Sequence, residues 1–227
     1  MSHAHGHRHG QGPRHGAGRG HGHDHNSGVM TRSRGYYLMG TLLFGGRRRR
    51  AYRELVARSG ARPGDRVLDV GCGTGYLTGL LAEAVGPGGE AVGVDPSEAM
   101  VAQATEARSG AGARYLVGFA ESLALEDGSF DVVTSSLALH HIDEDHRQAA
   151  AGEMARVLRP GGRVLVADFR PPSGRFGQWF VKNVVGLGMA SNPVDTMAPL
   201  LARAGFTGLS SGDAKPWLHW VCGTKPS

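Results

Sequence analysis

Residues 66–75 read RVLDVGCGTG, a short apolar run that closes in three glycines. The β-branched and aliphatic side chains of 66–70 predict a buried strand. Gly71, Gly73 and Gly75 predict a sharp turn whose backbone can lie against a ligand without a Cβ in the way. Residues 76–85 place apolar side chains at helical spacing, so the stretch predicts a strand, a glycine-rich loop and a helix in succession.

The same alternation continues to the end of the chain. We expect further helices and strands at regular intervals, with helices of about 10–15 residues between strands. Expected helices cover 47–60, 97–107, 143–158 and 194–206; expected strands cover 89–95, 113–118, 130–139, 162–169, 207–211 and 217–223. Such alternation predicts an α/β fold of the doubly wound, Rossmann-like kind, with a mostly parallel sheet and a closing antiparallel strand.

The first 34 residues differ from the rest in composition. They consist largely of Gly, His and Arg, and we expect a disordered tail because almost nothing in it can be buried. Its alternating histidines, as in residues 3–9 and 21–25, could chelate Ni²⁺ or Zn²⁺ adventitiously, as any such peptide does. We expect residues 35–227 to form one domain, with no metal site of its own and a lid at 170–190.

Charge and cysteine content restrict the kinds of partner and the cellular compartment that we expect for this protein. The net charge is +5, but residues 1–34 and the run 47–50 each carry +4, so the remainder stands at −3. These remaining residues are mildly acidic overall, so they do not predict a surface that binds nucleic acid. The sequence also predicts no signal peptide and no membrane span, and its two cysteines suit a reducing compartment. We therefore expect a cytoplasmic protein; its oligomeric state is not readable.

The glycine loop at residues 71–75 and the acidic residue Asp95 together predict a ligand that contains a nucleoside. The spacing is G-x-G-x-G, and Tyr76 occupies the place where a dinucleotide fingerprint has its third glycine. Asp95 ends the expected strand 89–95, where a carboxylate can accept hydrogen bonds from both hydroxyls of a ribose. The alternative for Asp95 is an acid that only stabilises a helix N-terminus.

Four stretches together resemble a known family. VLDVGCGTGYLT, VGVDPSEAM, GFAESLALEDGSFDVVTSSLALHH and RVLRPGGRVLVADFRPP are similar to the successive motifs of class I S-adenosylmethionine-dependent methyltransferases, over about residues 50–170. Within that class the chain resembles the small-molecule group that includes the ubiquinone/menaquinone C-methyltransferases. The resemblance implies S-adenosylmethionine as cofactor and a small, lipophilic or aromatic metabolite as methyl acceptor.

The resemblance also assigns cofactor-binding residues. The glycine loop would cradle the methionine moiety, Asp95 would hold the ribose, Ser136 would lie beneath the sulfonium, and residues 96–97 and 119–121 would border the adenine. The full set is Asp69, Gly71, Cys72, Gly73, Gly75, Asp95, Pro96, Ser97, Phe119, Ala120, Glu121 and Ser136. Phe119 stands where the family often has an acid, and Glu121 could replace that carboxylate. The N-terminal signature typical of the quinone enzymes is missing.

Substrate and catalytic residues are expected around the same edge of the sheet. His140 and His141 follow the strand expected at 130–139 and are candidate general bases, the alternative being structural histidines. Tyr36 and Tyr37 lie at the start of the domain, before its first motif, where relatives have a cap over the cofactor. Trp179 and Phe180 belong to an apolar segment that either lines an acceptor pocket or is plain core.

Two other function classes share part of the pattern. A nicotinamide-dependent oxidoreductase would use the same loop and acid, but it would need the glycine that Tyr76 replaces. A non-catalytic protein that binds a cofactor or a metal would keep the fold as a scaffold and use the histidine-rich tail.

Overall fold

The computed structural model describes Met1 and residues 47–108, 110, 112–170 and 194–227. In these residues helices and strands alternate as the sequence predicts. The strands are β1 (Arg66–Val70), β2 (Glu90–Asp95), β3 (Ala113–Val117), β4 (Phe130–Ser136), β5 (Leu158–Phe169), β6 (Thr207–Ala214) and β7 (Leu218–Thr224). The helices are α2 (Arg48–Ser59), α3 (Tyr76–Val85), α4 (Glu98–Arg108), α5 (Glu144–Val157) and α7 (Val194–Arg203), with a 3-10 turn η1 (Leu139–His141).

The strands of the described residues form one sheet in the order β3-β2-β1-β4-β5-β7-β6. Neighbours from β3 to β5 pair in parallel, whereas β7 is antiparallel to both β5 and β6. The predicted fold class, a mostly parallel sheet with a closing antiparallel strand, is therefore confirmed. The order of the strands reverses between β1 and β4, and this is the position where open α/β sheets bind ligands.

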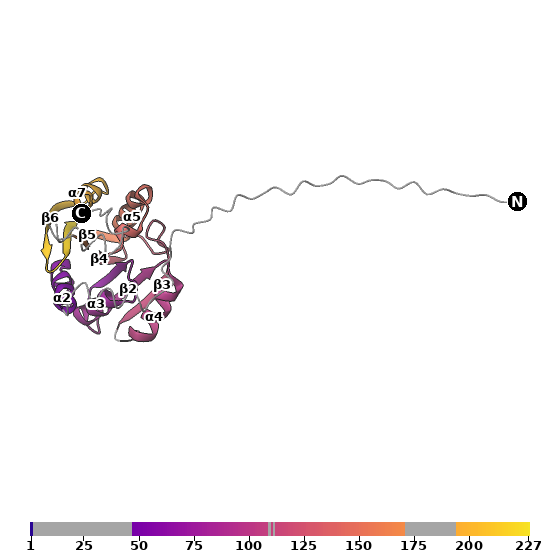
Figure 1. The fold of residues 1–227 in the computed structure, drawn as a ribbon, viewed down its shortest axis with the longest axis horizontal. Coiled ribbons are helices and arrows are strands. Elements are labelled where there is room, and N and C mark those ends of the chain that lie inside the picture. The colour runs from indigo at the N-terminus through magenta and orange to yellow at the C-terminus, as the bar shows by residue number, and fades with distance from the viewer. Residues whose placement is uncertain (2–46, 109, 111, 171–193) are drawn as a thin grey trace, which may run out of the picture.

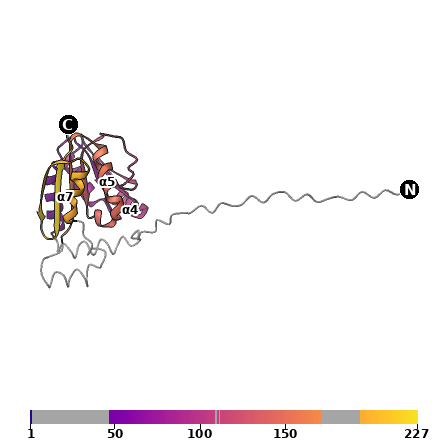
Figure 2. The same cartoon turned by 90° about the horizontal axis from the view of Figure 1, so that it is seen from above.

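Helices cover both faces of the sheet, as Figure 1 shows, with α2, α3 and α4 on one side and α5 and α7 on the other. Viewed from above, α5 and α7 lie side by side, and the two helices are in contact (Figure 2). No helix of the described ranges is long and apolar enough to cross a membrane.

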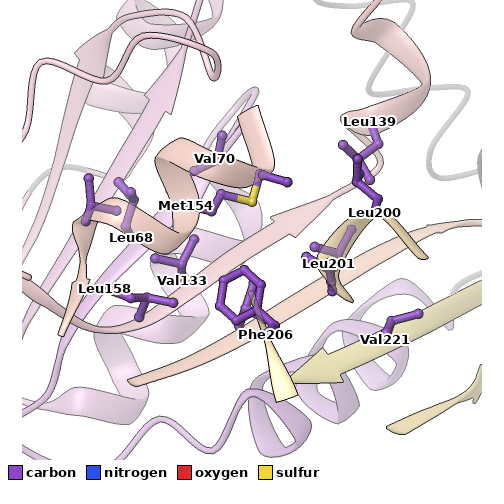
Figure 3. Close-up of a cluster of buried hydrophobic side chains, with 14 of the residues drawn as sticks. Leu68, Val70, Val133, Leu139, Met154, Leu158, Leu200, Leu201, Phe206 and Val221 are labelled. Carbon is purple, nitrogen blue, oxygen red and sulfur yellow. The ribbon is translucent and has the colours of Figure 1, made fainter. Parts of the chain in front are cut away.

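Alternating side chains of the central strands fill two large cores, one on each face of the sheet. Leu68, Val133 and their neighbours face α5 and α7, where they pack with Met154, Leu200 and Phe206 (Figure 3). The intervening side chains, such as Val67 and Leu165, pack with α2 and α3 on the opposite face. Strands that are buried on both faces explain why the sequence shows continuous apolar runs rather than an alternation of apolar and polar residues.

Several predicted boundaries are wrong, and one of them matters for the site. The strand expected at 130–139 ends at Ser136, because Leu137 adopts a left-handed φ of 56° and the chain turns into η1. Similarly, the helix expected at 143–158 ends at Val157, and the strand expected from 162 already starts at Leu158, which pairs with Phe130. The predicted end of α2 is correct: Gly60 has a φ of 69° and terminates the helix.

Candidate active site

The site lies at the carboxyl ends of β1, β2 and β4. The loop after β1 crosses this edge between two neighbours, one contributed by β2 and one by the turn after β4. A Cβ built on Gly71 would lie 2.3 Å from the Cβ of Ala138, so this position requires glycine. A Cβ on Gly73 would meet no atom within 4 Å, although its φ of 52° is left-handed. The loop thus packs tightly against the turn after β4 at Gly71 and leaves open space at Gly73.

Asp95, the last residue of β2, ties this loop in place. Its Oδ2 accepts a hydrogen bond from the Gly73 amide at 2.8 Å, and its Oδ1 accepts one from the Ser97 amide at 3.0 Å. Burial raises the pKa of the Asp95 carboxyl, and these two hydrogen bonds act in the opposite direction. Since a carboxylate has about four acceptor positions, both oxygens retain the capacity to accept from a ligand hydroxyl.

A pocket of about 370 Å³ opens at this edge. Eight of the predicted cofactor-binding residues and one predicted catalytic residue line it. They are Gly71, Gly73, Asp95, Pro96, Ser97, Phe119, Ala120, Glu121 and His141. Further lining residues that the sequence did not single out include Met100, Leu137, Ile142, Asp143 and His146.

The wall of the pocket at 119–121 combines an exposed aromatic ring with a carboxyl group. Phe119 is 53% exposed and lines the pocket, so its ring is accessible to a ligand. Its ring could cover one face of a flat heterocycle. Glu121 lines the same pocket, so it lies in the region where the missing acid was expected.

The other predicted cofactor residues lie beneath the loop rather than in the pocket wall. Asp69 is 2% exposed and accepts hydrogen bonds from the Thr78 hydroxyl at 2.7 Å and the Thr134 hydroxyl at 2.9 Å. Burial raises the pKa of Asp69 to about 6. Cys72 is buried with Tyr115, and burial raises the pKa of its thiol. These side chains support the loop from below.

Gly75 and Ser136 complete the set under the loop. A Cβ on Gly75 would lie 2.6 Å from the Tyr115 ring, so the end of the loop rests directly on this tyrosine. Ser136 is the last residue of β4 and is buried beside the turn into η1.

His140 forms a buried pair with Asp168, the penultimate residue of β5. Its Nδ1 lies 2.8 Å from Oδ1 of Asp168, and its backbone amide donates to Oδ2 at 3.2 Å. The Asp168 side chain is completely buried and that of His140 is 3% exposed. Because a carboxylate only accepts hydrogen bonds, Nδ1 carries a proton, and in the neutral form of the ring Nε2 has the lone pair. Nε2 has no hydrogen-bond partner within the described parts of the chain.

Sequence reasoning missed Asp168. The signal was available, because RVLVAD ends in an acid just as RVLDV and AVGVD place acids at the ends of their strands. Acids at the carboxyl ends of neighbouring strands meet at one edge of a parallel sheet. The strand that follows the histidine pair could therefore have been searched for its partner.

His141 and His146 approach the pocket from the turn and from α5. The ring of His141 lies 4.0 Å from that of His140, measured between centroids. His141 is an exposed residue, but partial desolvation by its surroundings, with a smaller contribution from His140, lowers its pKa to about 4. His141 is therefore neutral near pH 7 and can serve the pocket as a hydrogen-bonding group rather than as a cation.

Several predicted features fall outside the described residues. Apart from Met1 and Arg170, these are the tail at 1–34, the residues Tyr36 and Tyr37 of the expected cap, and the expected lid at 170–190 with Trp179 and Phe180. For these the sequence-based expectations stay predictions.

Known proteins that are similar to this chain are methyltransferases. Residues 67–162 match the family model described as "Methyltransferase domain". The chain is 41% identical over 141 residues to the ubiquinone/menaquinone biosynthesis C-methyltransferase UbiE of Ectopseudomonas mendocina, an alignment that covers 60% of this chain and 54% of that protein. The chain thus spans about half the length of the curated relatives it matches.

Solved structures agree with this result. A SAM-dependent methyltransferase from Thermotoga maritima superimposes with a TM-score of 0.61 at 25% identity, covering 84% of this chain and 95% of that one. Phosphoethanolamine N-methyltransferase 2 of Haemonchus contortus, solved with S-adenosyl-L-methionine, gives a TM-score of 0.66 at 18% identity, covering 88% and 59%. Residues 67–162 therefore match a methyltransferase domain, and the predicted resemblance of the chain to class I methyltransferases and to the UbiE C-methyltransferases is confirmed.

Proposed function

We propose that this chain transfers the methyl group of S-adenosylmethionine to a small, lipophilic or aromatic acceptor. The observation that carries the proposal is the glycine loop tied to Asp95 by the Gly73 amide, opposite the exposed Phe119 ring in one pocket. A nucleoside offers the two features that this pocket is suited to bind, a ribose diol and a flat base.

The residues present fit this cofactor. Both carboxylate oxygens of Asp95 would accept from the ribose hydroxyls while they keep the Gly73 and Ser97 amides. The adenine would lie between Phe119 and the side chains after β2, with Glu121 near its amino group. The open space at Gly73 would let the backbone approach the ligand closely. When bound, S-adenosylmethionine supplies an electrophilic methyl group on a sulfonium.

The chain itself has to orient the acceptor, exclude water and take up a proton. Orientation alone can lower a barrier by about 7–11 kcal/mol, so a strong base is not required for every acceptor. For an acceptor that attacks through a hydroxyl or a protonated nitrogen, we assign the base to Nε2 of His140. Asp168 acts as a positioning residue, since its carboxylate fixes the proton on Nδ1. His141 would contribute a neutral hydrogen-bonding group beside it.

Two other function classes are less well supported. An NAD-dependent oxidoreductase would bind a pyrophosphate at the end of the loop, but Tyr76 replaces the glycine there and stacks edge-on against Tyr52. A non-catalytic binding protein has no need of a buried histidine that a buried carboxylate orients.

Partners and location follow from the same argument. A pocket of about 370 Å³ suits a small molecule, and we infer no nucleic-acid partner. We propose a cytoplasmic location, which suits two cysteines that both remain free thiols. Binding of Ni²⁺ or Zn²⁺ by the histidine-rich tail remains a proposal from the sequence.

Calorimetry with S-adenosylhomocysteine and with NAD tests the proposal. We expect micromolar binding of the former and none of the latter. Asp95→Ala should weaken S-adenosylhomocysteine binding about 10- to 100-fold, because a charge-assisted acceptor is lost. Glu98→Ala, which removes an exposed acid of the next helix, is the matched control and should change nothing. Unchanged affinity in Asp95→Ala would refute the role of Asp95.

Transfer itself can be screened without knowledge of the acceptor. Protein supplied with radiolabelled S-adenosylmethionine and lipophilic extracts of the source cells should produce labelled small molecules. His140→Gln should abolish the labelling of hydroxylated acceptors while cofactor affinity persists. Label that appeared only on protein or RNA would contradict a small-molecule acceptor.

A further inference from the structure

Helix α2 carries three arginines on the side that is turned away from the core. The helix lies beside α3 on one face of the sheet (Figure 1) and is buried there through residues such as Tyr52 and Leu55. Arg49, Arg50 and Arg53 are all exposed, and residues four apart on a helix share one side. We call these three arginines the basic face of α2. It concentrates three positive charges within the first two turns of one helix.

No acid neutralises the basic face of α2. The one acid of the helix, Glu54, forms its ion pair with Arg58, at 3.6 Å. Within the described ranges, no carboxylate forms an ion pair with any of the three arginines. The rest of the sequence contains a single acid, Asp24. The basic face therefore keeps its positive charge.

These charges also occupy the less favourable end of the helix. The first turn of α2 holds no acid, and the positive end of the helix dipole lies at the same place as the arginines. Cations at this end lower the stability of a helix, and here no ion pair within the described chain offsets that loss. An arrangement that opposes local stability in this way indicates a role in binding.

The basic face lies at the edge of the sheet that carries the pocket. At the start of α2, the guanidinium carbon of Arg48 is 4.2 Å from the centroid of the Tyr76 ring, and Tyr76 directly follows the glycine loop. At the other end of the helix, a Cβ on Gly60 would lie 2.9 Å from Nε of Arg163, near the beginning of the parallel part of β5. The helix thus runs along the sheet, with its arginines nearer the edge that carries the pocket.

The surroundings of the arginines favour a membrane over a protein or a nucleic acid. The large apolar side chains that are exposed in the described residues are Met1, Val117 and Phe119, and none belongs to α2. The basic face therefore lacks the apolar centre of a protein interface and the aromatic rings on which unpaired bases stack. A bilayer with anionic lipids requires only cations at its surface. The sequence that leads into the helix, residues 35–46, carries no charge and is largely apolar, with two tyrosines, which suits the interfacial layer of a membrane.

We propose that the basic face of α2 binds the surface of a membrane that contains anionic lipids. The edge of the sheet with the pocket would then lie close to the layer in which a lipophilic acceptor is dissolved. This link to the acceptor rests on the proposed function, whereas binding to the lipid surface does not. The attraction acts between exposed charges, so salt should weaken it strongly.

Flotation of the full chain with lipid vesicles tests this surface. The protein should bind vesicles of phosphatidylcholine mixed with phosphatidylglycerol, fail to bind pure phosphatidylcholine, and leave the anionic vesicles at high salt. Arg49→Gln combined with Arg53→Gln should weaken binding about 10- to 30-fold. Arg49→Lys combined with Arg53→Lys keeps both charges and should bind as the wild type does.

A matched control removes the same charge elsewhere. Arg62 and Arg203 are exposed and lie outside α2. Arg62→Gln combined with Arg203→Gln should weaken vesicle binding less than about threefold, because only charges near the lipid surface contribute fully. The affinity of every variant for S-adenosylhomocysteine, measured by calorimetry, should equal that of the wild type and shows that the domain is folded.

The outcomes separate this inference from the proposed function. Unchanged vesicle binding of the glutamine variant in α2 would overturn the inference. Equal weakening by the control would also overturn it, because the vesicles would then respond to net charge alone. Tighter binding of polyuridylate RNA than of anionic vesicles would identify a nucleic-acid surface instead. Wild-type protein that bound anionic vesicles through α2 but no S-adenosylhomocysteine would refute the proposed function and leave the membrane surface in place.

Discussion

Replacement of Gly73 by alanine separates the binding role of the loop from its folding role. Gly73 lines the pocket, has a φ of 52° and has no atom within 4 Å of an added Cβ. The variant therefore loses only the cost of a left-handed alanine, roughly 1–2 kcal/mol of unfolding free energy. For a domain of this size that corresponds to about 2–4 °C in Tm per kcal/mol. The added methyl group occupies space that a nucleoside needs, so the affinity for S-adenosylhomocysteine should fall at least tenfold.

Gly64 provides the matched control. It has a φ of 88°, an added Cβ there also meets no atom within 4 Å, and it does not line the pocket. Gly64→Ala should lose a similar amount of stability in urea unfolding and none of the affinity measured by calorimetry. If both variants bound the ligand equally well, the open space at Gly73 would not be the ligand site. A loss of several kcal/mol in Gly73→Ala alone would show that the loop packs more tightly than described.

Three further experiments address ionisable groups at the site. Asp168→Asn should lower kcat about 10²-fold or more, through misorientation of His140, with S-adenosylhomocysteine affinity unchanged; an equal loss of affinity would indicate a structural role. Because Asp69 has a raised pKa of about 6 and a usual value near 3.8, the folded state binds the extra proton, and stability falls as pH rises from about 4 to 6. The unfolding free energy of Asp69→Asn relative to wild type should therefore rise by about 3 kcal/mol over that range, and a flat difference would contradict the raised pKa. NMR titration of the His141 ring should give a pKa of about 4, and a value near 6.5 would show that water reaches the ring freely.

Much of the fold was predictable because its signals are local. The strand at 66–70, the helix at 76–85 and Gly60 at the end of α2 follow from apolar periodicity and from the one residue type that tolerates a positive φ. The end of β4 was not predictable in this way. Leu137 is apolar and continues the strand pattern, yet its left-handed φ depends on contacts with Ala167 and on the neighbouring loop.

The residues of the site also fall into those that local sequence predicts and those that depend on packing between distant segments. Residues that contact a ligand through a loop after a strand, such as Gly71 and Asp95, were predictable from motif and spacing. The contribution of Asp168 depends on pairing with His140 across 28 residues. Local sequence patterns do not show such a pairing. Sequence identified the ends of the strands, and only packing shows which of their side chains meet.

The bonds that Asp95 makes to the amides of Gly73 and Ser97 exist before any ligand arrives. A site that is assembled in advance spends little conformational entropy on closing around its ligand. The pre-formed site also binds the product of the cofactor with little loss of conformational entropy. S-adenosylhomocysteine differs from the methyl donor only by the transferred group, and it would meet the same preassembled loop and carboxylate. The spent cofactor is therefore expected to compete strongly with the fresh one. The rate of turnover in a cell would then follow the ratio of the two nucleosides as much as the supply of acceptor.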